Sequence, residues 1–233
     1  MKIFTPIREK TQKLALKKII ACRGKSDGEP SIASATDGVE IWLDLIGDLE
    51  IPALLKHAKM PVICVCKDKA EGGRFTGNRA QMAGLLIQAA KCGADYIDIP
   101  FSMPKNLSKK IVQQAPRNVK IIISFHDFKK TPSLINLQKL ALKMCAKGAD
   151  IVKIACMART LSDTLQMVCL AQILQSKKIP HILIAMGKKG TLSRVLTPKL
   201  GGDIMFAPLS SRGASAPGQL KVNELRAAWN LLA

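Results

Sequence analysis

Short apolar segments rich in β-branched residues alternate along the chain with longer segments in which apolar residues recur at helical spacing. The short segments predict buried strands, and they cover residues 17–22, 39–45, 61–66, 95–99, 119–125, 150–155, 180–186 and 203–208. The longer segments predict helices over roughly 51–58, 78–92, 107–114, 132–147, 161–176, 192–199 and 222–232. Gly93 and Gly148 stand two residues before predicted strands, where helix C-caps belong.

Strand and helix therefore alternate eight times within 233 residues, and no Pro/Gly/Ser-rich linker interrupts them. A chain of this length could form one large α/β domain or two small ones. The count and the continuity of the alternation favour an α/β fold made of a single (β/α)8 TIM barrel that spans residues 1–233.

Such a barrel places its catalytic residues at the C-terminal ends of the strands and in the loops that follow them. Polar residues lie at these positions on the second to eighth predicted strands: Glu40, Asp44, Lys67, Glu71, Asp98, His126, Lys153, Arg194, Ser215 and Gln219. Because side chains alternate along a strand, Glu40, Trp42 and Asp44 are expected to share one face.

Lys153 interrupts the apolar segment 150–155. Burying an unpaired lysine in its charged form is costly, so a buried lysine tends to lower its pKa. A neutral amine can attack a carbonyl group and form a Schiff base. The alternative is a structural lysine at a strand end, with a packed stem and a hydrated head group.

His126 lies one βα unit before Lys153, so the two residues are expected on adjacent strands with their ends at the same edge. An imine makes the neighbouring C–H bond acidic, and an imidazole with a pKa of about 6.5 can take that proton. The pair suits elimination or aldol-type chemistry on a small keto compound. Glu71 and Asp98 could orient the imidazole or form ion pairs with lysines.

Arg194, Ser215 and Gln219 are candidates for binding an anion, either a carboxylate or a phosphate. No P-loop or dinucleotide-binding motif is present. The three histidines are far apart and lack metal-binding spacing, so we expect no metal site.

The net charge of +19 raises the question of nucleic-acid binding. The basic residues are scattered, aromatic residues make up only 4% of the chain, and no nucleic-acid-binding motif is present. We interpret the charge as solvated surface with some bias toward anionic substrates, and we expect no nucleic-acid partner.

No apolar run approaches the roughly 18 residues that span a bilayer, and residues 1–11 lack the apolar core of a secretory signal. We therefore expect no membrane partner. The seven cysteines form an odd set, mostly within apolar segments, which indicates buried free thiols in the cytoplasm.

Seven segments in order along the chain resemble the type I 3-dehydroquinate dehydratase family. They are EIWLD (40–44), EGGRF (71–75), ADYIDI (94–99), SFHDF (124–128), ADIVKIA (149–155), MGKKGTLSR (186–194) and SAPGQ (215–219). The resemblance implies dehydration of 3-dehydroquinate to 3-dehydroshikimate in the shikimate pathway, without a cofactor or metal, by a homodimer. The family also occurs fused to a shikimate dehydrogenase domain.

The resemblance also implies roles for single residues. Lys153 matches the Schiff-base lysine and His126 the general acid/base. Glu71 matches an active-site carboxylate, with Asp98 near it. The substrate-binding positions are matched by Glu40, Lys67, Arg194, Ser215 and Gln219.

The chain departs from the family pattern at four places. Trp42 and Lys67 stand where the family usually has arginine, Pro100 stands where it often has glutamate, and Cys22 stands near an expected polar residue. These changes affect affinity and substrate range more than imine chemistry, and Trp42→Arg is expected to tighten substrate binding. The alternatives are a Schiff-base aldolase and a non-catalytic barrel that binds an anionic molecule.

Overall fold

The computed structural model describes residues 1–8, 10, 36–47, 49–58, 60–208 and 218–232 of the chain. These residues form two compact units. One consists of Phe4–Ile122, and the other combines Met1–Ile3 with Ile123–Ala233.

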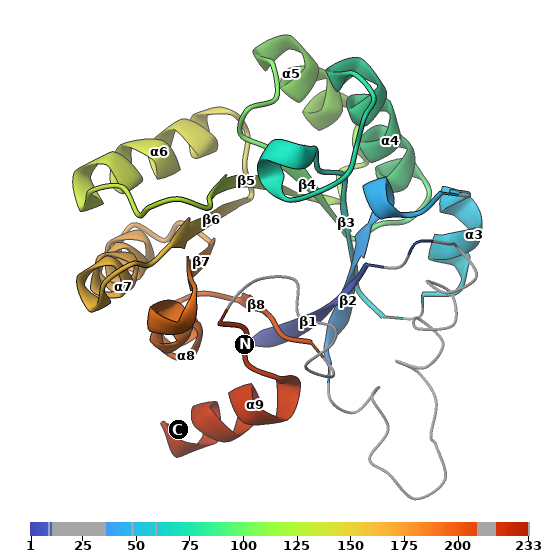
Figure 1. Cartoon of the computed structure of the whole chain (residues 1–233). Helices are drawn as coiled ribbons and strands as arrows, with labels where there is room; N and C mark the ends of the chain where they lie inside the picture. The colour runs from blue at the N-terminus through green and yellow to red at the C-terminus, as the bar shows by residue number, and fades with distance from the viewer. Residues whose placement is uncertain (9, 11–35, 48, 59, 209–217, 233) are drawn as a thin grey trace, which may run out of the picture. The chain divides into compact units, whose positions relative to one another are not determined.

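The Phe4–Ile122 unit contains parallel strands that pair in chain order. They are β1 (Lys2–Ile7, whose first two residues belong to the other unit), β2 (Gly38–Trp42), β3 (Val62–Val65) and β4 (Tyr96–Pro100). The helices of this unit are α3 (Ile51–Lys56), α4 (Arg79–Lys91) and α5 (Lys105–Gln114). Helices α4 and α5 pack side by side (Figure 1).

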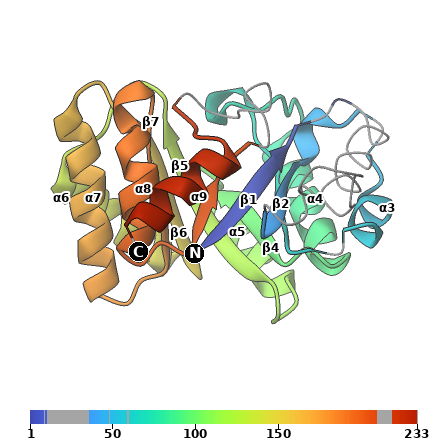
Figure 2. The same ribbon diagram turned by 90° about the horizontal axis from the view of Figure 1, so that it is seen from below.

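The second unit contains most of β5 (Lys120–Asp127), then β6 (Ile151–Met157), β7 (His181–Met186) and β8 (Ile204–Phe206). Its helices are α6 (Leu134–Ala146), α7 (Leu161–Ser176), α8 (Thr191–Lys199) and α9 (Val222–Leu231). Helices α6, α7 and α8 lie side by side in both views, and they cover β6 and β7 (Figures 1 and 2). Strand β6 pairs with β7 in parallel, with Lys153 opposite Ile182.

Strands β2, β3, β7 and β8 are buried throughout, and β1, β4 and β6 along most of their length. This is the pattern of parallel strands covered on both faces. In β5 only the first half after Lys120 is buried. Two helices begin at capping boxes: Asn78 and Gln81 form one at α4, and Thr160 and Asp163 form one at α7. No helix in the described parts of the chain is both long enough and apolar enough to span a bilayer.

The helix predictions and the strand predictions from 39–45 onward are confirmed, with boundaries that differ by a few residues. The predicted strand 17–22 lies outside the described residues. The observed first strand, β1, was not predicted because Lys2, Thr5 and Pro6 break its apolar pattern. Gly93 and Gly148 have the left-handed backbone of helix C-caps, with φ of 103° and 92°.

The prediction that Asp44 continues the second strand is wrong. Strand β2 ends at Trp42, and Asp44 lies in the 3-10 helix η1 (Leu43–Leu45). The side-chain alternation that places Glu40 and Trp42 on one face therefore does not extend to Asp44.

His181, at the start of β7, makes the stability of the fold depend on pH. Its side chain is fully buried, and burial lowers its pKa below 6.5, although the Ile179 carbonyl and the charge of Asp203 favour the protonated ring. Below pH 6.5 the unfolded chain therefore binds more protons than the folded chain. The free energy of unfolding keeps its full value above pH 6.5 and decreases as the pH falls below it. We expect a slope of up to about 1.4 kcal/mol per pH unit from this group.

The measurement is urea unfolding between pH 7.5 and 5.5 for the parent chain and for His181→Gln. The variant is expected to lose stability less steeply on acidification, even if it is less stable at every pH. Parallel curves for the two proteins would show that His181 is not the titrating group.

Candidate active site

Lys153 is buried in the middle of β6, with 4% of its surface exposed. Its Nζ atom lies 4.3 Å from the centre of the Phe206 ring, which belongs to β8. An aromatic face favours a nearby ammonium, while the loss of water favours the neutral amine. The alternative of a structural lysine with a hydrated head group does not fit this burial.

His126 lies near the end of β5, the strand next to β6 in the sheet, as the sequence predicted. Its ring stacks on Phe128, with 6.0 Å between the ring centres and 13° between the planes. The loop after β5 is tied to the end of β6, because Thr131 donates a hydrogen bond of 3.0 Å to the Met157 carbonyl. These contacts fix the course of the chain around His126.

The glycines of two sequence motifs meet after β7. Gly218 has φ of 74°, and a Cβ atom there would collide with the carbonyl oxygen of Gly187. The Thr191 hydroxyl donates to the Gly218 carbonyl at 3.3 Å. Gln219 donates its amide nitrogen to the Phe206 carbonyl at 2.9 Å, so it links the motif to β8. Ser215, also predicted as a site residue, lies outside the described residues.

Arg194 lies on α8 and is 1% exposed. Burial lowers its pKa to about 10, so the guanidinium remains charged at neutral pH. A charged group at this depth requires acceptors or an anion to offset its loss of hydration. This requirement is consistent with the predicted role of Arg194 in anion binding.

A buried ion-pair cluster lies at the ends of β3 and β4 in the other unit. Lys67 Nζ is 3.2 Å from Glu71 Oε2 and 3.4 Å from Asp98 Oδ1. All three residues are buried, with 0%, 7% and 0% of their surfaces exposed. The ion pair with a lysine that was predicted for Glu71 and Asp98 is present, and their other role, orienting the imidazole of His126, stays a prediction.

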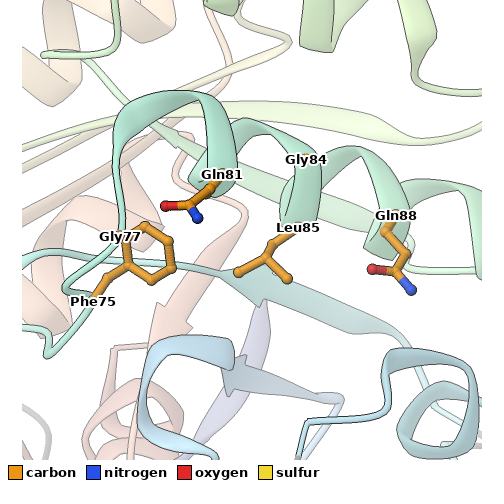
Figure 3. Close-up of a pocket in the computed structure, with 6 residues that line it drawn as sticks. All are labelled: Phe75, Gly77, Gln81, Gly84, Leu85 and Gln88. Carbon is orange, nitrogen blue, oxygen red and sulfur yellow. The ribbon is translucent and has the colours of Figure 1, made fainter.

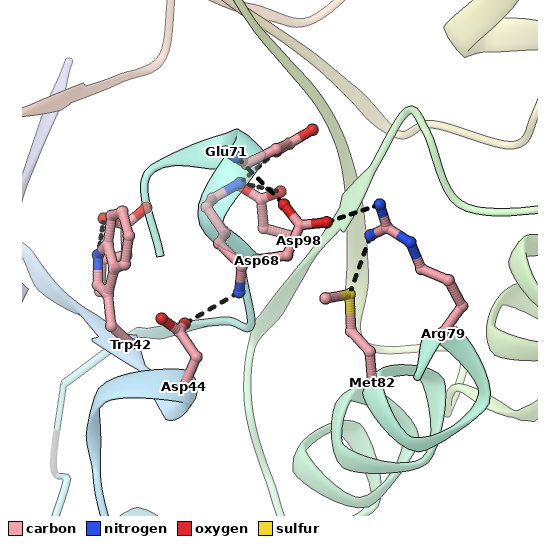
Figure 4. Close-up of polar contacts among 9 residues, drawn as sticks. Trp42, Asp44, Asp68, Glu71, Arg79, Met82 and Asp98 are labelled. Atoms are coloured by element: carbon pink, nitrogen blue, oxygen red, sulfur yellow. Dashed lines mark hydrogen bonds and ion pairs between the residues drawn. The ribbon is translucent and has the colours of Figure 1, made fainter. Parts of the chain in front are cut away.

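The loop after β3 carries this cluster, and Asp44 holds the loop in place (Figure 4). Its carboxylate accepts hydrogen bonds of 2.9 Å from the backbone N–H groups of Lys67 and Arg74. Burial raises the pKa of Asp44, although these bonds favour its charged form. Gly73 is required here because a Cβ atom would collide with the Lys67 carbonyl and lie 2.6 Å from Asp44 Oδ2.

Asp68 fixes the other side of the same loop. It caps the 3-10 helix η2 (Lys69–Glu71) by accepting from the Glu71 backbone at 3.1 Å. It also forms a 2.7 Å ion pair with Arg79 at the start of α4 (Figure 4). The position of Glu71 is therefore set by its own helix cap as well as by Lys67.

Glu40 and Trp42 form a second buried pair at the end of β2. The indole Nε1 donates a 2.8 Å hydrogen bond to Glu40 Oε2, and the two residues are 7% (Trp42) and 2% (Glu40) exposed. The guanidinium of Arg8 lies 4.2 Å from the centre of the Trp42 ring. Sequence reasoning missed Arg8 because it follows the strand that was not predicted.

The six cysteines in the described residues are free, as predicted. Cys64, Cys66 and Cys156 are buried, and burial raises the pKa of both Cys66 and Cys156 to about 12. Thiols of this kind are poor nucleophiles at neutral pH. The prediction of burial is wrong for Cys169, which is exposed.

A surface groove of about 560 Å³ runs beside α4 (Figure 3). Its lining consists of Phe75, Gly77, Gln81, Gly84, Leu85 and Gln88. No ionisable side chain lines it, and the Gln81 side chain already caps α4 by accepting from the Asn78 backbone at 2.8 Å. The groove therefore offers apolar surface rather than catalytic groups.

Comparison with known proteins points to one family. The model of the family described as type I 3-dehydroquinase matches residues 5–233. A 3-dehydroquinate dehydratase of Methanosarcina mazei is 31% identical over 232 residues, which is 95% of this chain and 96% of that protein. The chloroplastic bifunctional 3-dehydroquinate dehydratase/shikimate dehydrogenase of Arabidopsis thaliana is 34% identical over 83% of this chain. The match spans about a third (32%) of that protein's length.

Solved structures agree with the sequence comparison. The type I 3-dehydroquinate dehydratase of Clostridium difficile, solved with covalently modified comenic acid, superposes with a TM-score of 0.86 at 26% identity. The match covers 99% of this chain and 91% of that one. The 3-dehydroquinate dehydratase of Geobacillus kaustophilus shares the fold, with a TM-score of 0.87 at 22% identity over 99% and 90% of the two chains. The predicted (β/α)8 TIM-barrel fold is confirmed.

Proposed function

Because the chain belongs to the type I 3-dehydroquinase family, we propose that it acts through a Schiff base between Lys153 and 3-dehydroquinate. The enzyme is a 3-dehydroquinate dehydratase, a hydro-lyase of the shikimate pathway. The observation that carries the proposal is the burial of Lys153 at 4% exposure, on the strand next to the one that bears His126.

The reaction begins when the neutral Lys153 amine attacks the ring ketone. The adduct takes up a proton from solvent and loses water, which gives a protonated imine. His126 then removes the acidic α-proton, and the electrons of that C–H bond form the new ring C=C bond as the β-hydroxyl leaves. The imidazolium returns its proton to the departing hydroxyl, which leaves as water. Hydrolysis of the imine releases 3-dehydroshikimate and restores the amine.

The remaining site residues receive binding and electrostatic roles. Glu71 is proposed as a catalytic carboxylate, since Lys67 and the cap of η2 hold it at 7% exposure. Glu40 and Lys67 are proposed to bind ring hydroxyls. Arg194, Ser215 and Gln219 are proposed to bind the carboxylate of the substrate, because a buried guanidinium favours an anion.

Three further proposals concern the protein as a whole. We propose that residues 1–233 act as a single catalytic barrel domain and that the enzyme works as a homodimer without a cofactor or metal. The free cysteines fit a cytoplasmic location. Light scattering of the purified protein tests the dimer, with twice the 25.3 kDa chain mass as the expected result.

The activity assay follows the absorbance of the conjugated product during incubation with 3-dehydroquinate. Turnover is expected with the parent chain and with Lys143→Ala, which removes an exposed lysine on α6. Parallel assays with aldol substrates distinguish a dehydratase from an aldolase. Tight binding of 3-dehydroquinate without turnover would instead indicate the non-catalytic barrel.

A further inference from the structure

Arg8 occupies a defined position at the C-terminal end of β1. Ile7, the last residue of β1, pairs with Ile41, so Arg8 and Trp42, which follow them in the chain, lie beside each other. The Arg8 guanidinium carbon lies 4.2 Å from the centre of the indole ring. Its Nη2 donates a 3.3 Å hydrogen bond to the carbonyl of Gly72, the residue after Glu71.

This stack connects Arg8 to a proposed substrate-binding residue. The indole Nε1 is bonded to Glu40 at 2.8 Å, so the ring that supports the guanidinium also holds the carboxylate of Glu40. Trp42 is 7% exposed and therefore forms a fixed base for both contacts.

A guanidinium can bind more than one partner at the same time. The group carries five N–H donors, which lie in its plane. Lys67, the buried cation of the same unit, lies between the carboxylates of Glu71 and Asp98. Arg8 is only partly buried, so a ligand can reach it.

We propose that Arg8 is a substrate-binding and specificity-determining residue, which donates to an oxygen of the cyclic hydroxy-keto acid. It takes over the role that the family pattern gives to an arginine at position 42, and Trp42 serves as its platform. This inference rests on the proposed function. It also changes the expectation for Trp42→Arg, which should give little benefit while Arg8 is present.

The test compares KM and kcat for 3-dehydroquinate in a small set of variants. Arg8→Ala is expected to raise KM about tenfold, the scale of a lost charge-assisted contact, while kcat changes less than about threefold. Arg8→Lys should recover only part of the loss, because lysine lacks the planar fork. Arg117→Ala, which removes an exposed arginine before β5, should match the parent chain.

The double variant Arg8→Ala/Trp42→Arg gives the sharpest comparison. If Arg8 supplies the missing guanidinium, the second substitution should restore most of the KM that the first one lost. Trp42→Arg alone should not tighten binding, because the role is already filled and the platform of Arg8 and the partner of Glu40 are lost. Thermal unfolding of each variant separates binding effects from loss of the fold.

An unchanged KM in folded Arg8→Ala would overturn the inference, and so would tighter binding by Trp42→Arg alone with no restoration in the double variant. Either result leaves the proposed function intact as long as the parent chain dehydrates 3-dehydroquinate. Absence of turnover in the parent chain would instead remove the function, whatever Arg8 does.

Discussion

Lys153→Ala is expected to lower kcat/KM for 3-dehydroquinate by at least about 10⁴-fold, the scale of losing a covalent nucleophile. The amine that activates the ketone is then absent, and no imine can draw electrons from the α-carbon. Lys153→Arg should be equally inactive because it keeps a positive charge but cannot condense with the ketone. Steady-state kinetics of both variants provide the measurement.

Lys143→Ala is the matched control, because it removes an exposed lysine on the helix before β6. It is expected to retain the parent activity. Substantial activity in folded Lys153→Ala would exclude the Schiff-base mechanism while leaving the dehydratase assignment open to another chemistry. Circular dichroism and thermal unfolding establish that the inactive variants are folded.

His126→Ala is expected to lower kcat by about 10²–10⁴-fold, the range for removal of a general acid/base. Imine formation should survive, because the attacking amine comes from Lys153. The measurement combines steady-state kinetics with borohydride reduction of the imine between Lys153 and the substrate. The variant should therefore turn over slowly and still give a reduced covalent adduct.

His57→Ala is the control for this variant, since His57 is exposed at the end of α3, where its ring nitrogen contacts the carbonyl of Ala53 at 2.8 Å. It should behave as the parent chain. Full turnover by His126→Ala would remove the imidazole from the mechanism and would leave the carboxylates of the Lys67 cluster as the candidates for the base.

Local sequence signals predicted much of the fold because they act over short distances. Helix α7 was predicted over residues 161–176 and observed as Leu161–Ser176, and the capping box that starts it is readable from the sequence. Strand β1 was missed because its burial depends on pairing with β2 rather than on its own composition.

The candidate site was predicted in part for the same reason. A lysine inside an apolar strand predicts burial from its neighbours alone, and Lys153 is buried. The contact between Lys67 and Asp98 joins residues 31 positions apart, so the sequence left their pairing open. The contact between the Arg8 guanidinium and the Trp42 ring depends on the register of β1 against β2, which no local sequence pattern shows.

The loop that carries Glu71 is held in place by residues whose role depends on contacts between distant chain segments. Asp44 was predicted as a strand carboxylate, yet it lies against Gly73 and holds the backbone of Lys67. The requirement for glycine arises from close approach of other chain segments rather than from a turn conformation. Only the folded structure shows which segments approach.

The most direct test of the central claim is the mass of the protein after borohydride treatment with 3-dehydroquinate. The proposed mechanism predicts a single reduced adduct on the peptide that contains Lys153, absent in Lys153→Ala and retained in His126→Ala. Turnover without any adduct, or an adduct located on another lysine such as Lys67, would contradict it.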